Sequence, residues 1–203
     1  MISTMDKQTL IFLGPQGRGK GTQIQLLKDY ITAKDAARSI VHFEMGKQLR
    51  ERATKDDYTG RLTNEILLAG GLIPYAISAS LFAQYLMDTI ATGEEHLVID
   101  GFPRTATQVP TLDSALTEFY KREMPTVVCI NISDDEAVAR LLKRGRHDDT
   151  EESIRTRLAW SRKDTMPNIE WFRSNPQYKV VDIDGERSVE EIHTDILEKL
   201  NLS

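Results

Sequence analysis

The chain alternates short apolar runs with longer segments in which apolar residues recur every three or four positions. Short apolar runs bounded by polar turns predict buried strands, and the longer period predicts amphipathic helices. Five strands are predicted on this basis. They lie at residues 7–13, 39–43, 96–99, 126–131 and 179–183.

Helices are predicted between these strands. They cover residues 19–31, 75–90, a segment ending near 121, 134–143, 151–172 and 189–200. Strands that alternate with helices predict an α/β fold, in which a parallel sheet carries helices on both faces. Ligands of such sheets bind beyond the carboxyl ends of the strands.

Residues 44–72 form a charged helical region with little apolar mass, so we expect a small lobe on the core and not an independent domain. Gly46, Gly60 and the pair Gly70-Gly71 are expected to break this region into pieces, because glycine is a poor helix former.

A glycine-rich turn follows the first predicted strand, at residues 14–22. Its spacing fits a phosphate-binding loop, in which glycines turn several N–H groups toward one point at a helix N-terminus. Lys20 adds a movable positive charge, and the Thr22 hydroxyl can contact a hydrated Mg²⁺. A plain glycine-rich turn is the alternative, but the buried strand before it and the helix after it favour a nucleotide site.

Composition narrows the class of protein. The 203 residues are 40% hydrophobic and 28% charged, which is typical of one soluble globular domain. A net charge of −5 argues against nonspecific nucleic-acid binding. The single cysteine, Cys129, lies in a predicted strand and is expected to be a buried, inert thiol. Without a long apolar span or leader, neither membrane insertion nor secretion is expected, and we predict a cytoplasmic protein.

A second motif follows the third strand, at residues 98–105 (Val-Ile-Asp-Gly-Phe-Pro-Arg-Thr). A carboxylate at the end of a strand, here Asp100, can position Mg²⁺-bound water beside the loop. Arg104, held by a proline turn, offers a planar fork to a second phosphate.

With the loop at 14–23, the block at 100–105, Gln108, and residues 144–158, the chain resembles the adenylate kinase family of nucleoside monophosphate kinases over nearly its full length. The resemblance implies a P-loop NTPase-type three-layer fold with a five-stranded parallel sheet, in one kinase domain at 1–203. It also implies an inserted monophosphate-binding lobe at about 44–73 and a very short lid at about 144–150. We therefore expect a monomer that reversibly transfers a phosphoryl group from Mg-ATP to AMP, giving two ADP, with Mg²⁺ as cofactor.

The resemblance also assigns roles to single residues. The implied catalytic residues are Lys20, Arg104, Arg144, Arg146 and Arg157. The implied ATP-binding residues are Gly14, Gly17, Arg18, Gly19, Lys20, Gly21, Thr22, Arg140, Arg144 and Arg187. The implied AMP-binding residues are Met45, Arg50, Ile73, Gly101, Arg104, Gln108, Arg146 and Arg157. Asp100 would hold Mg²⁺ through water.

The acceptor base stays open at this point. Met45 stands where relatives typically carry threonine and cannot hydrogen-bond a base, so a UMP or CMP kinase is the alternative enzyme. The Gln108 amide can pair with an adenine edge and favours AMP. A catalytically weak nucleotide sensor is the alternative from another class, although a pure binder has no need of a full set of lid arginines.

Two further expectations concern the region after residue 143. Asp148 and Asp149 either pair with the lid arginines or only begin the helix before Thr150. Because the lid is so short, Arg146 and Arg157 are expected to reach inward directly.

Four large side chains are predicted to form a core-facing stripe on the long helix, and the histidines are predicted to be ordinary surface or packing residues. The stripe comprises Trp160, Met166, Trp171 and Phe172, and the histidines are His42, His96, His147 and His193.

Overall fold

A five-stranded sheet forms the centre of the molecule in a computed structural model that describes residues 5–202; residues 1–4 and 203 of the expected domain lie outside that range. The strands run in the order β2-β3-β1-β4-β5, and each neighbouring pair is parallel, as predicted. Their bounds are β1 (Thr9–Leu13), β2 (Ile40–Glu44), β3 (His96–Asp100), β4 (Thr126–Asn131) and β5 (Lys179–Asp184).

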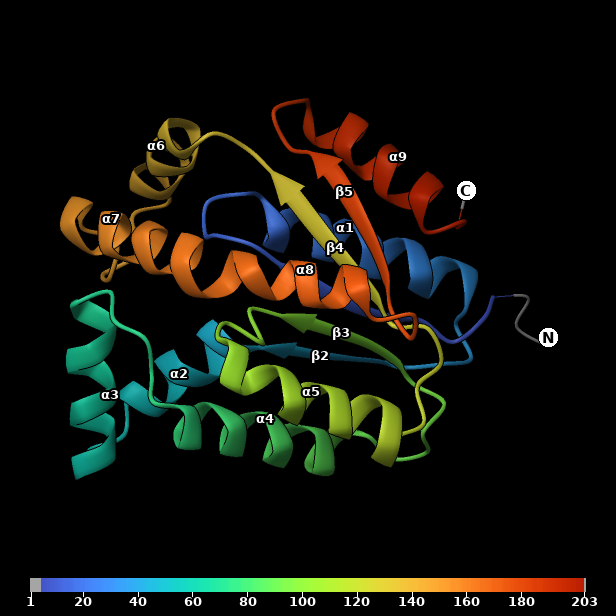
Figure 1. Cartoon of the computed structure of the whole chain (residues 1–203), viewed down its shortest axis with the longest axis horizontal. Helices are drawn as coiled ribbons and strands as arrows, with labels where there is room; N and C mark the ends of the chain where they lie inside the picture. The colour runs from blue at the N-terminus through green and yellow to red at the C-terminus, as the bar shows by residue number, and fades with distance from the viewer. Residues whose placement is uncertain (1–4, 203) are drawn as a thin grey trace.

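Helices connect the strands (Figure 1). The α-helices are α1 (Lys20–Lys34), α2 (Met45–Ala53), α3 (Tyr58–Leu68), α4 (Tyr75–Thr89), α5 (Val109–Asp113), α6 (Asp134–Arg144), α7 (Glu151–Trp160), α8 (Met166–Ser174) and α9 (Val189–Lys199). A 3₁₀ turn, η1 (Ala106–Gln108), precedes α5, and two π-helical segments are η2 (Ser114–Phe119) and η3 (Ser161–Thr165). No helix in the described part of the chain is both long and apolar enough to cross a membrane.

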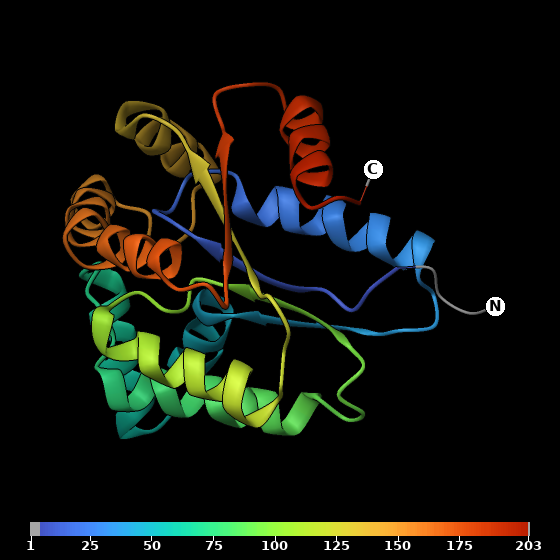
Figure 2. The same cartoon turned by 45° about the vertical axis from the view of Figure 1, so that its right-hand side comes forward.

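Helices lie on both faces of the sheet, so the fold has three layers (Figure 2). A separate cluster of buried apolar side chains lies on each face. Helices α1 and α9 cover one face and contribute Ile24, Leu27 and Ile196 to its core. Helices α4, α5 and α8 cover the other face, where Phe82 and Phe102 stack with ring centroids 4.4 Å apart. Burial of both faces explains why the strands are almost continuously apolar.

The charged helical region expected at 44–72 forms α2 and α3, but Gly46 and Gly60 do not break it as predicted. Gly46 and Gly60 lie inside α2 and α3, and the chain breaks between these helices at residues 54–57. A Cβ on Gly60 would lie 2.0 Å from the Lys55 carbonyl oxygen, so this glycine permits a close backbone approach. The pair Gly70-Gly71 lies in the break between α3 and α4, as predicted, and Gly70 has φ +67°.

His96 is fully buried and has polar partners, which goes beyond the packing role predicted for it. Its Nε2 lies 3.1 Å from Asp35 Oδ2, and the backbone N–H of Gln8 donates to its Nδ1 at 3.1 Å. Because Nδ1 accepts a hydrogen bond, Nε2 must carry the proton, and the ring is neutral. Burial lowers the pKa of His96, and the hydrogen bond to Asp35 offsets only part of that effect.

We expect the free energy of unfolding to decrease as pH falls from 7 toward 5. The unfolded chain protonates His96 near its ordinary pKa of about 6.5, whereas the folded protein does so only at lower pH, so stability is lost in this window. In His96→Gln the dependence should be shallower. Part of the pH dependence should remain in this variant, because burial also lowers the pKa values of His42 and His193. Denaturant titrations at several pH values measure the slope.

His147→Gln is the matched control, since that side chain is 57% exposed. It should leave the pH dependence of stability as in the wild type. The same slope in His96→Gln as in the wild type would contradict the prediction.

Candidate functional site

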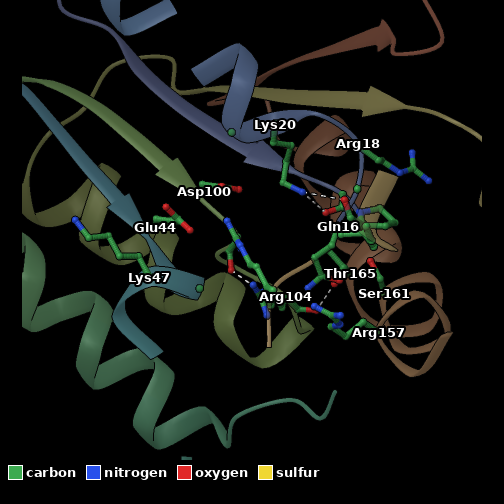
Figure 3. A pocket seen from close by; sticks show the side chains of 18 of the residues that line it. Gln16, Arg18, Lys20, Glu44, Lys47, Asp100, Arg104, Arg157, Ser161 and Thr165 are labelled. Carbon is green, nitrogen blue, oxygen red and sulfur yellow. Dashed lines mark hydrogen bonds between the residues drawn. The ribbon is translucent and has the colours of Figure 1, made fainter. Parts of the chain in front are cut away.

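The carboxyl ends of all five strands lie at one edge of the sheet. The β2–β3 register places Glu44 directly opposite Asp100, and Gly14 follows the end of β1. Above this edge lies a cavity of about 770 Å³, lined by the glycine-rich loop, α2, the turn after β3, α6 and the α7–η3 segment (Figure 3).

The glycine-rich loop has a backbone that side chains would disturb. Gly14, Gly17 and Gly19 have φ values of 114°, 84° and 78°, and a Cβ on Gly17 would lie 2.6 Å from the Ala137 carbonyl oxygen of α6. Gly19 is the N-cap of α1, and no side chain caps this helix. Its N-terminal N–H groups are therefore available to an anion.

Lys20 curves back over the loop. Its Nζ donates to the Gly14 and Pro15 carbonyl oxygens, each at 2.9 Å. Removal from water lowers the pKa of Lys20 to about 8; the negative charge of Asp100 opposes this shift, and the charge of Arg104 adds to it. The ammonium group thus sits in the cavity with weak neutral partners that a phosphate can replace.

Arg18 lines the cavity but ties the loop to the sheet. Its Nη1 donates to the Ile130 carbonyl oxygen and to Asn131 Oδ1, each at 3.1 Å. The guanidinium group therefore braces the loop against the end of β4.

Two arginines lie on the side of the cavity formed by α2 and the turn after β3. Arg50 pairs with Glu44 at 2.8 Å, with each side chain about a quarter exposed. The Arg104 Nε donates to the Gly101 carbonyl oxygen at 2.9 Å, and a Cβ on Gly101 would lie 3.0 Å from an Arg104 nitrogen. Burial lowers the pKa of Arg104, with Asp100 opposing the shift.

Asp149 joins an arginine at the end of α6 to an arginine in α7. Arg144 and Arg157 each approach its Oδ1 at 2.8 Å, and its side chain is fully buried. Burial opposes ionisation of Asp149, but hydrogen bonds from the two arginines outweigh it and lower the pKa. Of the two alternatives considered for the acidic pair, the structure shows pairing with the arginines, since Asp148 also lies 3.6 Å from Arg157. The cap of α7 is made by Thr150 and Ser153 in a capping box.

Arg140 and Arg146 complete the cationic lining. Arg140 pairs with Glu136 at 2.7 Å and donates to the Gly185 carbonyl oxygen at 3.2 Å. Burial lowers the pKa of Arg146, with Arg144 and Arg50 adding to the shift. Both Arg146 and Arg157 face the cavity, the inward placement expected from the short lid.

Most of the expected site residues line this one cavity. They are Gly14, Gly17, Arg18, Gly19, Lys20, Gly21, Thr22, Arg50, Asp100, Gly101, Arg104, Arg140, Arg144, Arg146 and Arg157. Arg187 instead lines a neighbouring cavity of about 320 Å³. Arg18, Gly19 and Arg140 line both cavities.

Three residues expected at the acceptor base lie away from the cavity lining. Met45 and Ile73 are buried in the core, with Met45 packed beside Leu49 at the start of α2. Gln108 is also buried: its Oε1 accepts from the Arg104 backbone N–H at 2.6 Å, and its Nε2 donates to Ser78 Oγ at 2.8 Å. Its amide completes the cap of η1 in this structure, so it does not present a free edge to a base.

Several lining residues were not predicted, among them Glu44, Trp160 and Thr165. Glu44 could have been found, because it ends a strand next to the one that ends in Asp100. The stripe expected on the long helix is only partly present. Phe172 is buried and Met166 packs on the core, but Trp171 is 39% exposed and Trp160 faces the cavity.

The oxygen donors beside the loop suit a hydrated Mg²⁺. Asp100 and Thr22 both line the cavity, and burial raises the pKa of Asp100 while the charge of Lys20 opposes this shift. Carboxylate and hydroxyl oxygens are hard ligands of the kind Mg²⁺ takes alongside water and phosphate.

Comparison with known proteins agrees with this geometry. Residues 12–177 match the family model described as adenylate kinase. Proteins named adenylate kinase from Corynebacterium urealyticum and Prochlorococcus marinus are 37% and 31% identical, covering 90% and 96% of this chain and 93% and 99% of their own lengths. A Nostoc protein named adenylate kinase 1 is 37% identical, over 90% of this chain and 93% of its own length. The chain therefore belongs to the adenylate kinase family.

Proposed function

We propose that this protein catalyses the reversible transfer of a phosphoryl group from Mg-ATP to AMP, giving two molecules of ADP. The observation that supports it is the convergence of Lys20 with arginines from α2, the turn after β3, α6, the lid loop and α7 on one cavity. Phosphoryl transfer needs little more than alignment of the reactants and positive charge around the transferring group. The names of the similar proteins support AMP as the acceptor.

In this proposal the loop binds the ATP phosphates through its backbone N–H groups and Lys20, and Arg140 and Arg187 border the ATP base. Asp100 and Thr22 would hold Mg²⁺, which neutralises phosphate charge when bound. Arg144, Arg146 and Arg157 would surround the transferring group, and Asp149 would keep two of them in place until the nucleotides arrive.

Arg50 and Arg104 would bind the phosphate of AMP. A contact of Gln108 with adenine would require its amide to leave the Arg104 and Ser78 partners, so base selection would be coupled to the turn that carries Arg104. We place the base near residues 70–73, since Gly70 and Gly71 line the same cavity.

We further propose that residues 44–73 and 144–150 act as a monophosphate lobe and a lid that close over the two nucleotides and exclude water. We also propose that the protein acts as a monomer in the cytoplasm.

The assignment is tested by incubating the protein with Mg²⁺, ATP and each of AMP, CMP, UMP and GMP, and separating the products by chromatography. ADP should form fastest with AMP. Lys20→Ala and Arg104→Ala should each lower turnover about 10³- to 10⁵-fold, the range of losing a charge that stabilises phosphoryl transfer.

Arg155→Ala is the matched arginine control, because Arg155 is 67% exposed on α7 and pairs only with Glu151 among the described ion pairs. It should keep wild-type turnover. Faster phosphorylation of CMP or UMP than of AMP would overturn the choice of acceptor, and normal rates in a folded Arg104→Ala variant would overturn the site.

The lowered pKa of Lys20 predicts that the enzyme becomes less efficient at alkaline pH. kcat/KM for Mg-ATP reports groups of the free enzyme and should decline as pH rises above about 8, because Lys20 then loses the charge that attracts phosphate. In Lys20→Arg, a slower enzyme whose guanidinium stays charged, this decline should be absent. Steady-state rates from pH 6.5 to 9.5 provide the test, and a decline of equal size in both proteins would assign it to another group.

Glu44 competes with the acceptor phosphate for Arg50. We expect Glu44→Gln to lower KM for AMP by up to about fivefold, the scale of a partly exposed ion pair, and to leave KM for ATP unchanged. Glu151→Gln, which removes a carboxylate on the outside of α7, is the control and should change neither value. A higher KM for AMP in Glu44→Gln would mean that Glu44 helps to bind the acceptor.

A further inference from the structure

Trp160 makes two contacts that neither the motifs nor the general function explains. Its ring centroid lies 5.5 Å from the guanidinium carbon of Arg104, and its indole N–H donates to the Gly70 carbonyl oxygen at 2.9 Å. All three residues line the large cavity. Trp160 thus touches a phosphate-site arginine with its ring and the end of the lobe at 44–73 with its nitrogen.

Arg104 is restrained from three other directions as well. Gly101 accepts from its Nε, Gln108 accepts from its backbone N–H, and the Thr165 hydroxyl donates to its carbonyl oxygen at 2.9 Å (Figure 3). None of these contacts restrains the face of the guanidinium group. The Trp160 ring does so, because a cation is attracted to the face of an aromatic ring.

The π-helical segment η3 explains how one helix supplies both Trp160 and Thr165. In a π-helix the hydrogen bonds connect residues five apart, which brings such residues onto one side, whereas an α-helix turns them away from each other. Trp160 immediately precedes η3 and Thr165 ends it, and both line the cavity together with Ser161.

The contact with Gly70 connects this support to the lobe. Gly70 has φ +67°, and a Cβ there would lie 2.5 Å from the Ser153 carbonyl oxygen, so the end of α3 packs tightly on α7. The Trp160 N–H therefore bonds the lobe to the same helical run that supports Arg104.

We propose that Trp160 is a positioning residue for the monophosphate acceptor. Its ring holds the guanidinium group of Arg104 in the orientation that receives the acceptor phosphate, and its N–H couples that orientation to the position of the 44–73 lobe. This inference rests on the proposed function for the identity of the acceptor, but it concerns binding of a nucleoside monophosphate and can be tested without turnover.

Two substitutions separate the roles of the ring and the nitrogen. Trp160→Phe keeps an aromatic face over Arg104 and loses the N–H, whereas Trp160→Leu loses both. We expect the dissociation constant for AMP, measured by titration calorimetry, to rise no more than about threefold in Trp160→Phe and a further tenfold or so in Trp160→Leu, the scale of a partly desolvated cation–π contact. The dissociation constant for ATP should change less than about twofold.

Combining the substitutions at position 160 with Arg104→Ala tests whether the ring acts through the guanidinium group. In an Arg104→Ala background, the step from Phe to Leu at position 160 should no longer weaken AMP binding, because the ring then has no cation to hold. Trp171→Leu, which removes the other tryptophan, exposed on α8, is the matched control and should leave AMP binding unchanged.

Fluorescence gives a readout that a purely structural role would not produce. In Trp171→Phe the only indole is at position 160, and its emission should change as AMP saturates and stay constant with ATP alone.

Equal AMP affinity in Trp160→Phe and Trp160→Leu, or an undiminished Phe-to-Leu effect without Arg104, would overturn the inference. If wild-type protein makes no ADP from ATP and AMP while these binding results hold, the proposed function fails and the positioning role stands.

Discussion

The whole site depends on the parallel register of the sheet. Parallel pairing carries every strand to the same edge, so Glu44, Asp100 and the glycine-rich loop after β1 meet there although they are far apart in the chain. Both faces of the sheet are buried under helices, which leaves this edge as the place where polar groups can gather without cost to the core.

Positive charge is concentrated at this edge in a protein whose net charge is −5. Loss of water is the main reason that the pKa values of Lys20, Arg104 and Arg146 are lowered, and repulsion between close cations adds to it. Carboxylates within the site moderate the repulsion: Glu44 pairs with Arg50, and Asp149 with Arg144 and Arg157. Such pairs keep the arginines ordered and can be exchanged for phosphate, which has more acceptor oxygens to offer.

On the side of the cavity that we propose for the acceptor, the three residues expected to contact its base are engaged in packing or in a backbone cap. Met45 and Ile73 belong to the core, and Gln108 caps a turn. Gln108 also accepts a hydrogen bond from the backbone N–H of Arg104, so it supports the turn that carries this arginine. Selection of the acceptor would then depend on how the lobe and the Arg104 turn move together, which gives the contact between Trp160 and Gly70 its importance.

The sequence alone determined the strands, the parallel α/β architecture and the phosphate loop, because these follow from local apolar periodicity and from glycine spacing, which neighbours in space do not alter. It also pointed to Asp100 and Arg104, whose motif lies at the end of β3. The arginines at 144, 146 and 157 lie at the end of α6, in the next loop and in α7, and were expected from the family resemblance. Only the tertiary structure decided which way side chains point. Met45 is buried in the core, and the Gln108 side chain caps the turn at η1. Trp160 lines the cavity instead of the core, because η3 changes the helical period after it. The partners of Glu44 and His96 likewise come from contacts between distant segments, which no local pattern encodes.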